Sequence, residues 1–271
     1  MDILRYTFFQ HALTGSLLIA IACGIVGTYV VSRRFVFISG GITHASFGGL
    51  GLGFYLGINP FLTALGFAAL SAFGVEWVSR SYRVREDSAI AAVWSLGMAV
   101  GAICIVMTPG YAPNLSSYLF GNILTITRSD LIWTAMFTLV LCLFFACMHR
   151  EIIYTAFDRD FASTQRIRVK AIEYVMTLFI AITIVLSIRL AGIMLLMSLL
   201  TIPQMTVNLF TSDYRRIVAG SIILGFLACL AGLFLSFFLQ IPTGAFIIII
   251  LIFCFLAAKG ILSLSSSFAS K

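Results

Sequence analysis

The sequence predicts an all-α, polytopic membrane protein of about nine transmembrane helices, folded as a single domain over residues 1–271. Its mean hydropathy is +1.09, 61% of its residues are hydrophobic and only 10% are charged, whereas a soluble domain carries about 25% charged residues. Apolar segments recur at close to the ~20 residues that a helix needs to cross a bilayer. Basic residues gather on alternate connections, as they do on the cytoplasmic side of membrane proteins.

Nine segments are expected to span the membrane. Residues 1–11 form a short amphipathic lead that is expected at the interface, without the pattern of a cleavable signal peptide. Tyr118–Leu124 is too short to span, so a re-entrant or interfacial helix is expected there. Residues 261–271 are expected to form a cytoplasmic tail, and its serine-rich part, Ser263–Ser267, is expected to fray. The nine expected spans are residues 12–32, 36–57, 60–79, 88–108, 130–148, 171–188, 190–210, 216–238 and 243–260.

The orientation follows from where the basic residues lie. We place the long polar connection, residues 150–170, in the cytoplasm. All of the 17 lysines and arginines except Arg5, Arg128 and Arg189 then lie on the cytoplasmic side. The amino terminus is therefore expected outside the cell membrane and the carboxyl terminus inside.

The composition and the motifs exclude several functions. The net charge of +7 fits cytoplasmic loops, and no basic run interleaved with aromatic residues predicts nucleic-acid binding. The six cysteines lie in or at the ends of apolar segments and form no CxxC pair. No phosphate-binding loop, HExxH or GxSxG motif occurs. The chain is therefore not expected to be an enzyme or to hold a tightly bound cofactor, and any ATP that drives transport must bind another chain.

Ser39–Gly57 is the stretch around which the rest of the chain is expected to pack. Small residues at every fourth position form a stripe that lets another helix backbone approach closely within lipid. A neighbouring stripe of Gly40, His44 and Gly48 leaves the imidazole uncovered along its own helix face. An ionisable group inside a span is a candidate functional group. The packing stripe consists of Gly41, Ala45, Gly49, Gly53 and Gly57.

Three ionisable residues, His44, Glu86 and Asp87, lie in or at the start of expected spans. His44 lies ~15 Å from the cytoplasmic edge of its span at 1.5 Å per residue. A neutral imidazole there is a good transition-metal ligand, or a structural hydrogen-bond donor between helices. Glu86 and Asp87 begin the fourth span, where acids favour the positive end of the helix dipole. Because zinc takes about four donors, a metal site would need a homodimer or a pseudo-symmetric pair with a homologous chain.

The connection at residues 151–170 is amphipathic. Ile153, Ala156, Phe157 and Phe161 recur at helical spacing between charged residues. A short helix of this kind lies on the membrane or docks into a partner protein.

Pro203 lies within the seventh expected span. It removes one backbone donor and is expected to kink that helix. The carbonyl left without a donor then needs Thr201, Gln204 or a water molecule as its partner.

Four stretches, in this order, resemble a known family: Phe37–Gly57 with Thr43-His44-Ala45 at its centre, Arg85–Ser95, Leu115–Leu131 and Ile188–Val207. The segment FDRDFA at Phe157–Ala162 is similar to that family's cytoplasmic coupling segment. Over nearly its whole length the chain resembles the membrane permeases of bacterial ABC importers for zinc, manganese and iron.

The resemblance implies the helical fold of a type II ABC importer permease in the bacterial inner membrane. It also implies two permease copies over two cytoplasmic ATPase subunits, surrounded by membrane lipids, and an extracytoplasmic metal-binding lipoprotein that delivers the ion. The family's histidine falls on His44 and its acid in the fourth span falls on Glu86, both as ligands of the transported zinc, manganese or iron. The residues implied to lie in a groove of the ATPase are Phe157, Asp158, Asp160, Phe161 and Ala162.

The chain departs from the family at two positions. The family usually has an aspartate one turn before the histidine, where this chain has Gly40, and a glycine at the end of the coupling segment, where it has Arg166. Gly40 is also compatible with an iron–siderophore or another chelate as cargo, because a chelate needs a wide pathway with few ligands. A stand-alone secondary transporter or channel is the third alternative, and the sparse intramembrane charge argues against it.

Overall fold

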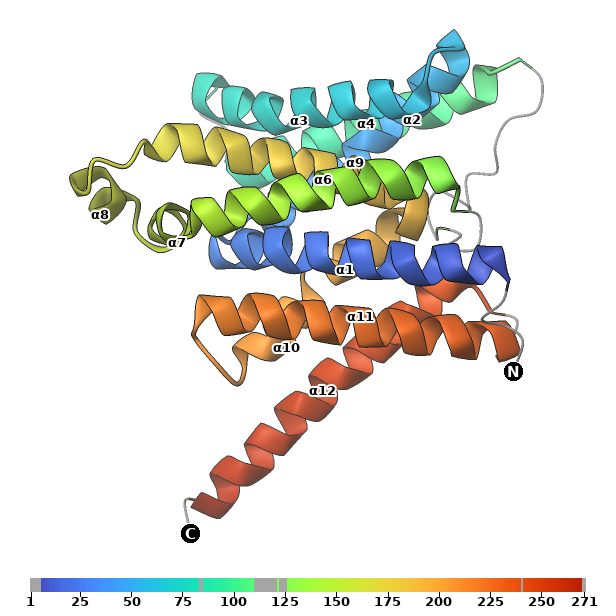
Figure 1. Ribbon diagram of the computed structural model, residues 1–271. Coiled ribbons are helices and arrows are strands. Elements are labelled where there is room, and N and C mark those ends of the chain that lie inside the picture. The colour runs from blue at the N-terminus through green and yellow to red at the C-terminus, as the bar shows by residue number, and fades with distance from the viewer. Residues whose placement is uncertain (1–5, 83–84, 110–120, 122–125, 240, 270–271) are drawn as a thin grey trace.

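The computed structural model describes all residues except 1–5, 83–84, 110–120, 122–125, 240 and 270–271. The described residues form helices and no strand, which confirms the predicted all-helical fold. Most helices run along one common direction, while α12 slants away from the bundle towards its carboxyl end (Figure 1). The helices are α1 (Thr7–Ser32), α2 (Val36–Leu56), α3 (Pro60–Tyr82), α4 (Glu86–Met107), α6 (Arg128–Cys147), α7 (His149–Phe157), α8 (Arg159–Thr164), α9 (Val169–Leu199), α10 (Ile202–Asn208), α11 (Tyr214–Leu239) and α12 (Thr243–Ala269).

The expected number of spans, about nine, is not confirmed. Within the described residues, seven helical segments are both long and apolar enough to cross a bilayer, and Pro60–Val75 is a shorter apolar helix. α2 is not among the seven, because its glycines and His44 dilute its apolar residues. The seven are Thr7–Ser32, Asp87–Met107, Arg128–Cys147, Val169–Ile188, Leu190–Asn208, Tyr214–Leu239 and Thr243–Leu264.

The ends of the chain differ from expectation. α1 begins at Thr7, inside the segment expected to lie at the interface. α12 continues to Ala269, so the serine-rich tail extends a helix instead of fraying. Apart from Gly121, the expected short helix at Tyr118–Leu124 lies outside the described residues. The helices α7 and α8 and the carboxyl end of α12 lie at one end of the bundle, opposite the amino end of α1 (Figure 1).

α2 lies between α3 and α4 at backbone contact distance. A Cβ added to Gly49 would lie 2.6 Å from the Cα of Ala64 in α3. On the other side, a Cβ added to Gly51 would lie 2.7 Å from the Cα of Gly101 in α4. Such distances leave no room for any side chain, so glycine is required on both sides of this helix.

The expected stripe of small residues divides between these two neighbours. Gly49 and Gly53 lie against α3, whereas Gly41 and Ala45 lie against α4. Gly57 makes no such contact, because it ends α2 in the left-handed region (φ 66) and a Cβ there would meet nothing within 4 Å. Its role is to stop the helix rather than to pack it.

The helix α9 has a kink at Gly192. Its φ of 78 and ψ of 164 are accessible only to glycine, and they divide α9 into two helical parts. The second part leads back through α10 to the end of the bundle that holds α7 (Figure 1). Sequence analysis expected a kink at Pro203 and did not foresee this bend.

Near Pro203 the helix is interrupted rather than kinked. The break falls at Thr201 (φ −129, ψ −51), and Pro203 lies in the first turn of α10, where its missing N–H leaves no hydrogen bond unmade. The carbonyl of Leu199, four residues earlier, accepts a 3.1 Å hydrogen bond from Nε2 of Gln204. The same amide nitrogen donates to the carbonyl of Cys23 in α1 at 2.9 Å, so Gln204 joins the break to the centre of the bundle.

Candidate functional site

His44 lies in the middle of α2 and faces α4. Its imidazole stacks on the indole of Trp94, with ring centroids 4.1 Å apart and the planes inclined by 9°. The histidine is half-buried, and its Nδ1 is buried without a hydrogen-bond partner among the described residues. A buried ring nitrogen without a partner costs free energy unless another group or a ligand pairs with it.

The glycines on either side of His44 allow α4 and α9 to approach α2 closely. A Cβ on Gly48 would lie 2.7 Å from the carbonyl oxygen of Gly97 in α4. A Cβ on Gly40 would meet only Met197 of α9, its methyl carbon at 3.0 Å and its sulfur at 3.8 Å. Gly40, at the position where the resembled family has an aspartate, therefore faces the flexible thioether of Met197. A thioether is a soft and weak metal ligand.

The structure does not describe the side chain of Glu86, the other expected ligand. The backbone of Glu86 begins α4, eight residues before Trp94, which is ~12 Å along a helix axis. In this chain the residue against His44 is Trp94, which sequence analysis did not single out although it lies in the matching stretch Arg85–Ser95. Among the residues described, no three of His, Cys, Asp or Glu gather to hold a metal ion.

The expected coupling segment forms two short helices, α7 and α8, that protrude from one end of the bundle (Figure 1). Asp158 separates them: its carboxylate accepts a 2.9 Å hydrogen bond from the N–H of Phe161 and caps α8. Phe157 and Phe161 are 61% and 45% exposed, whereas Ala162 is buried. Two phenylalanines thus present apolar surface at the outer end of the bundle while Ala162 fixes α8 to it.

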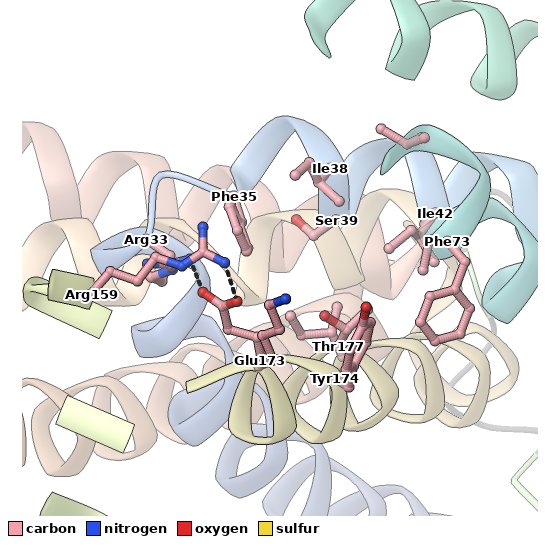
Figure 2. Close-up of a pocket in the computed structure, with 14 residues that line it drawn as sticks. Arg33, Phe35, Ile38, Ser39, Ile42, Phe73, Arg159, Glu173, Tyr174 and Thr177 are labelled. Atoms are coloured by element: carbon pink, nitrogen blue, oxygen red, sulfur yellow. Dashed lines mark hydrogen bonds and ion pairs between the residues drawn. The ribbon is translucent and has the colours of Figure 1, made fainter. Parts of the chain in front are cut away.

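An ion-pair network fastens α8 to the bundle. The carboxylate of Glu173 in α9 accepts from Arg33 at 2.7 Å and from Arg159 of α8 at 2.6 Å (Figure 2). Arg33, which directly follows α1, also donates to the carbonyl of Thr155 in α7 at 3.0 Å. The end of α1, α8 and α9 therefore meet at one acid, and Arg33 connects this network to α7. Sequence analysis missed Glu173, although an acid within the first turns of an apolar helix, beside a basic connection, was a usable signal.

Arg166 ends this segment, at the position where the resembled family has glycine. Its φ is 58, in the left-handed region that a residue with a Cβ adopts only at a cost. The backbone at Arg166 thus has a conformation that suits glycine.

A second polar contact joins the base of α7 to α11. Nε of Arg215 donates to Nε2 of His149 at 2.6 Å, which requires the imidazole to be neutral at that nitrogen. Burial of the ring and then the charge of Arg215 lower the pKa of His149 below its usual 6.5; the smaller effects are a lowering by Arg150 and a raising by Asp213 and Glu151.

This contact predicts a pH-dependent stability. Above pH 6.5 His149 is mainly neutral in both the folded and the unfolded chain. As the pH falls below 6.5, the unfolded chain binds a proton at His149 before the folded chain does. The free energy of unfolding therefore decreases with falling pH. We expect the melting temperature of the purified protein to fall between about pH 7.5 and 5.5, and to fall less for His149→Gln, whose amide oxygen accepts from Arg215 without titrating. Equal pH dependence of the two proteins would contradict this assignment.

Comparison with known proteins identifies the family of this chain. The sequence matches the ABC 3 transport family over residues 5–261. It is 34% identical over 256 residues to a probable metal transport system membrane protein of Chlamydia muridarum, covering 91% of this chain and 87% of that one. It is 28% identical over 268 residues to the manganese transport system membrane protein MntC of Halalkalibacterium halodurans, covering 97% and 92%.

The fold is also known from a solved structure. PsaBC from Streptococcus pneumoniae, determined in complex with a Fab, superposes with a TM-score of 0.87 at 24% identity, covering 95% of this chain and 92% of that one. The family match spans nearly the whole chain, and the helical architecture agrees with it. The chain therefore belongs to the ABC 3 transport family.

Proposed function

We propose that this chain is the permease subunit of an ATP-driven importer of a divalent transition-metal ion. As a member of the ABC 3 transport family it is a membrane permease and not itself an enzyme. The relatives named for metal and manganese transport support a metal as its cargo. Among zinc, manganese and iron, manganese is therefore the first ion to test.

The observation that most supports this function is the environment of His44. The imidazole stands in mid-helix among glycines, stacked on Trp94, with its buried Nδ1 unpartnered among the described residues. A structural histidine would donate a hydrogen bond to a neighbouring helix, and no such bond is formed here by the described groups. A transient metal ligand explains the free nitrogen.

A single chain offers too few ligands for this role. No cluster of three potential ligands forms within the described residues, whereas transition metals in proteins commonly take four or more donors. A second copy around a two-fold axis would double the number of imidazoles. Glu86 is the proposed second ligand or gate, and a homodimer is the simplest assembly that completes the site.

The ATPase is proposed to dock on α7 and α8. Exposed Phe157 and Phe161 offer apolar side chains that could insert into a groove of a partner, with the carboxylates of Asp158 and Asp160 beside them. The carboxyl end of α12 lies at the same end of the bundle (Figure 1). With the basic connections inside the cell, this end is cytoplasmic and the amino terminus faces the extracytoplasmic binding protein.

Metal uptake by His44→Ala tests the proposed ligand. Reconstituted with its partner ATPase and binding protein, the wild-type should take up manganese only when ATP is supplied, and His44→Ala should reduce the rate about tenfold or more. His11→Asn is the matched control, since His11 makes a hydrogen bond to the carbonyl of Ile126 far from this site. Normal uptake by His44→Ala would remove the ligand assignment but leave ATP-driven transport in place.

The same assay separates the alternatives. Gly40 supplies no hard donor beside His44, which favours a chelate such as an iron–siderophore as the second candidate cargo. If so, chelated metal should outcompete free manganese in the uptake assay. Uptake without ATP and without any ATPase would instead identify a secondary transporter or channel.

A further inference from the structure

A pocket of about 310 Å³ lies between α2, α3 and α9, with α8 at its mouth. Its charged part is formed by Arg33, Arg159, Lys170 and Glu173, and apolar side chains such as Phe73 line the rest (Figure 2). It is large enough to hold part of a small ligand. The proposed metal site does not use this pocket, and of the coupling helices only α8 lines it, through Arg159.

The pocket is on the opposite side of α2 from His44. Ser39 and Ile42 of α2 line the pocket. At 3.6 residues per turn, His44 is rotated from Ser39 by about 140° and from Ile42 by about 200°. The imidazole accordingly faces Trp94 in α4, so the pocket is separate from the proposed ion route.

The charged end of the pocket has an excess of positive charge. Three cationic side chains accompany one acid, and both carboxylate oxygens of Glu173 are already bound to Arg33 and Arg159. Lys170 is exposed and forms no ion pair with any described acid. Nε of Arg33 is buried without a partner among the described residues. An anion at this end would satisfy groups that the protein itself leaves unpaired.

The position of these cations matches the level of lipid headgroups. Arg33 directly follows the span Thr7–Ser32, and Lys170 is the second residue of the span Val169–Ile188. Both residues therefore stand at an end of a candidate span, where headgroups are expected. Phe73 and Tyr174 line the apolar part, and they are 45% and 51% exposed in the single chain. The pocket thus combines a cationic end, next to the ends of two expected spans, with an exposed apolar end.

We propose that this pocket binds the phosphate headgroup of an anionic phospholipid, with part of one acyl chain against Phe73. Basic pockets between transmembrane helices bind such headgroups because each cation near the surface attracts them and guanidinium groups donate in pairs to phosphate oxygens. The lipid would contact both Arg159 of α8 and α3, and so would bear on the coupling helices. This inference goes beyond the proposed transport function and does not depend on the identity of the cargo.

Thermal unfolding of the purified chain in mixed micelles tests the proposal. Phosphatidylglycerol should raise the melting temperature in a saturable manner, whereas zwitterionic phosphatidylcholine should not. Lys170→Gln should weaken the apparent affinity for phosphatidylglycerol about fivefold, the effect of removing one surface cation. Lys170→Arg should restore it. The matched control is Lys259→Gln, because Lys259 is exposed on α12 and lies outside the pocket.

Three results would overturn the proposal. The first is equal stabilisation by the two lipids, and the second is equal affinity of Lys170→Gln and Lys259→Gln for phosphatidylglycerol. The third is that soluble glycerol 3-phosphate stabilises the protein as strongly as phosphatidylglycerol does, which would assign the site to a free phosphate compound rather than to a lipid.

Discussion

Replacing Glu173 with glutamine should lower the free energy of unfolding by about 2 kcal/mol and disconnect ATP hydrolysis from transport. The substitution leaves Arg33 and Arg159 without their shared counter-charge, and the side chain of Arg33 is only 14% exposed. The loss is smaller than for a fully buried pair because Arg159 is 49% exposed and solvent screens it. Melting temperature measures the stability, and uptake per ATP hydrolysed by the assembled transporter measures the coupling.

Asp213→Asn is the matched control for Glu173→Gln. Asp213 also pairs with an arginine, Arg216, but at 3.6 Å and with both side chains at least half exposed. Asparagine keeps the acceptor that Asp213 offers to the N–H of Arg215. We expect a loss of no more than about 0.5 kcal/mol and normal coupling. If Glu173→Gln behaved like this control, the network would not link α8 to the bundle.

Gly49→Ala should destabilise the protein by about 3 kcal/mol although alanine favours helices. The added methyl group would lie 2.6 Å from the Cα of Ala64, and backbone cannot move aside as a flexible side chain can. The helices α2 and α3 would have to separate, which disturbs the position of His44 as well. The melting temperature should fall, and so should the rate of metal uptake.

Gly66→Ala provides the control within the facing helix. A Cβ on Gly66 of α3 would meet nothing within 4 Å, so only the backbone preference remains. This variant should be more stable than the wild-type by about 0.5 kcal/mol. Similar melting temperatures for Gly49→Ala and Gly66→Ala would show that close approach of α2 and α3 is not needed.

The positions of most helices could be predicted from the sequence because an apolar run of spanning length leaves few alternatives. The two amphipathic helices around Asp158 were also foreseeable, since their apolar residues repeat at helical spacing. The glycine pattern of α2 indicated close packing. The pattern could not show that α3 and α4 pack on two different sides of α2. It specifies which residues of α2 are small, but not which helix each of them contacts.

Other features depend on contacts between residues far apart in the chain, and no local pattern encodes them. Trp94 lies against His44, and Glu173 joins Arg33 to Arg159, only because the fold brings these segments together. The bend at Gly192 was equally hidden, since an isolated glycine within an apolar run is compatible with a straight helix. Candidate ligands can thus be identified from the spacing of residues in the sequence, whereas the residues that contact them are known only from the structure.

The contact of bare backbones on both flanks of α2 has a mechanical consequence. At these contacts backbone meets backbone, so the helices cannot shift relative to one another by a change of side-chain rotamers alone. We therefore expect α2, α3 and α4 to move together as one rigid body. A motion that opens a path for the cargo is then expected at contacts between helices that are made by long side chains. The ion pairs of Arg33 and Arg159 with Glu173 are a contact of this kind.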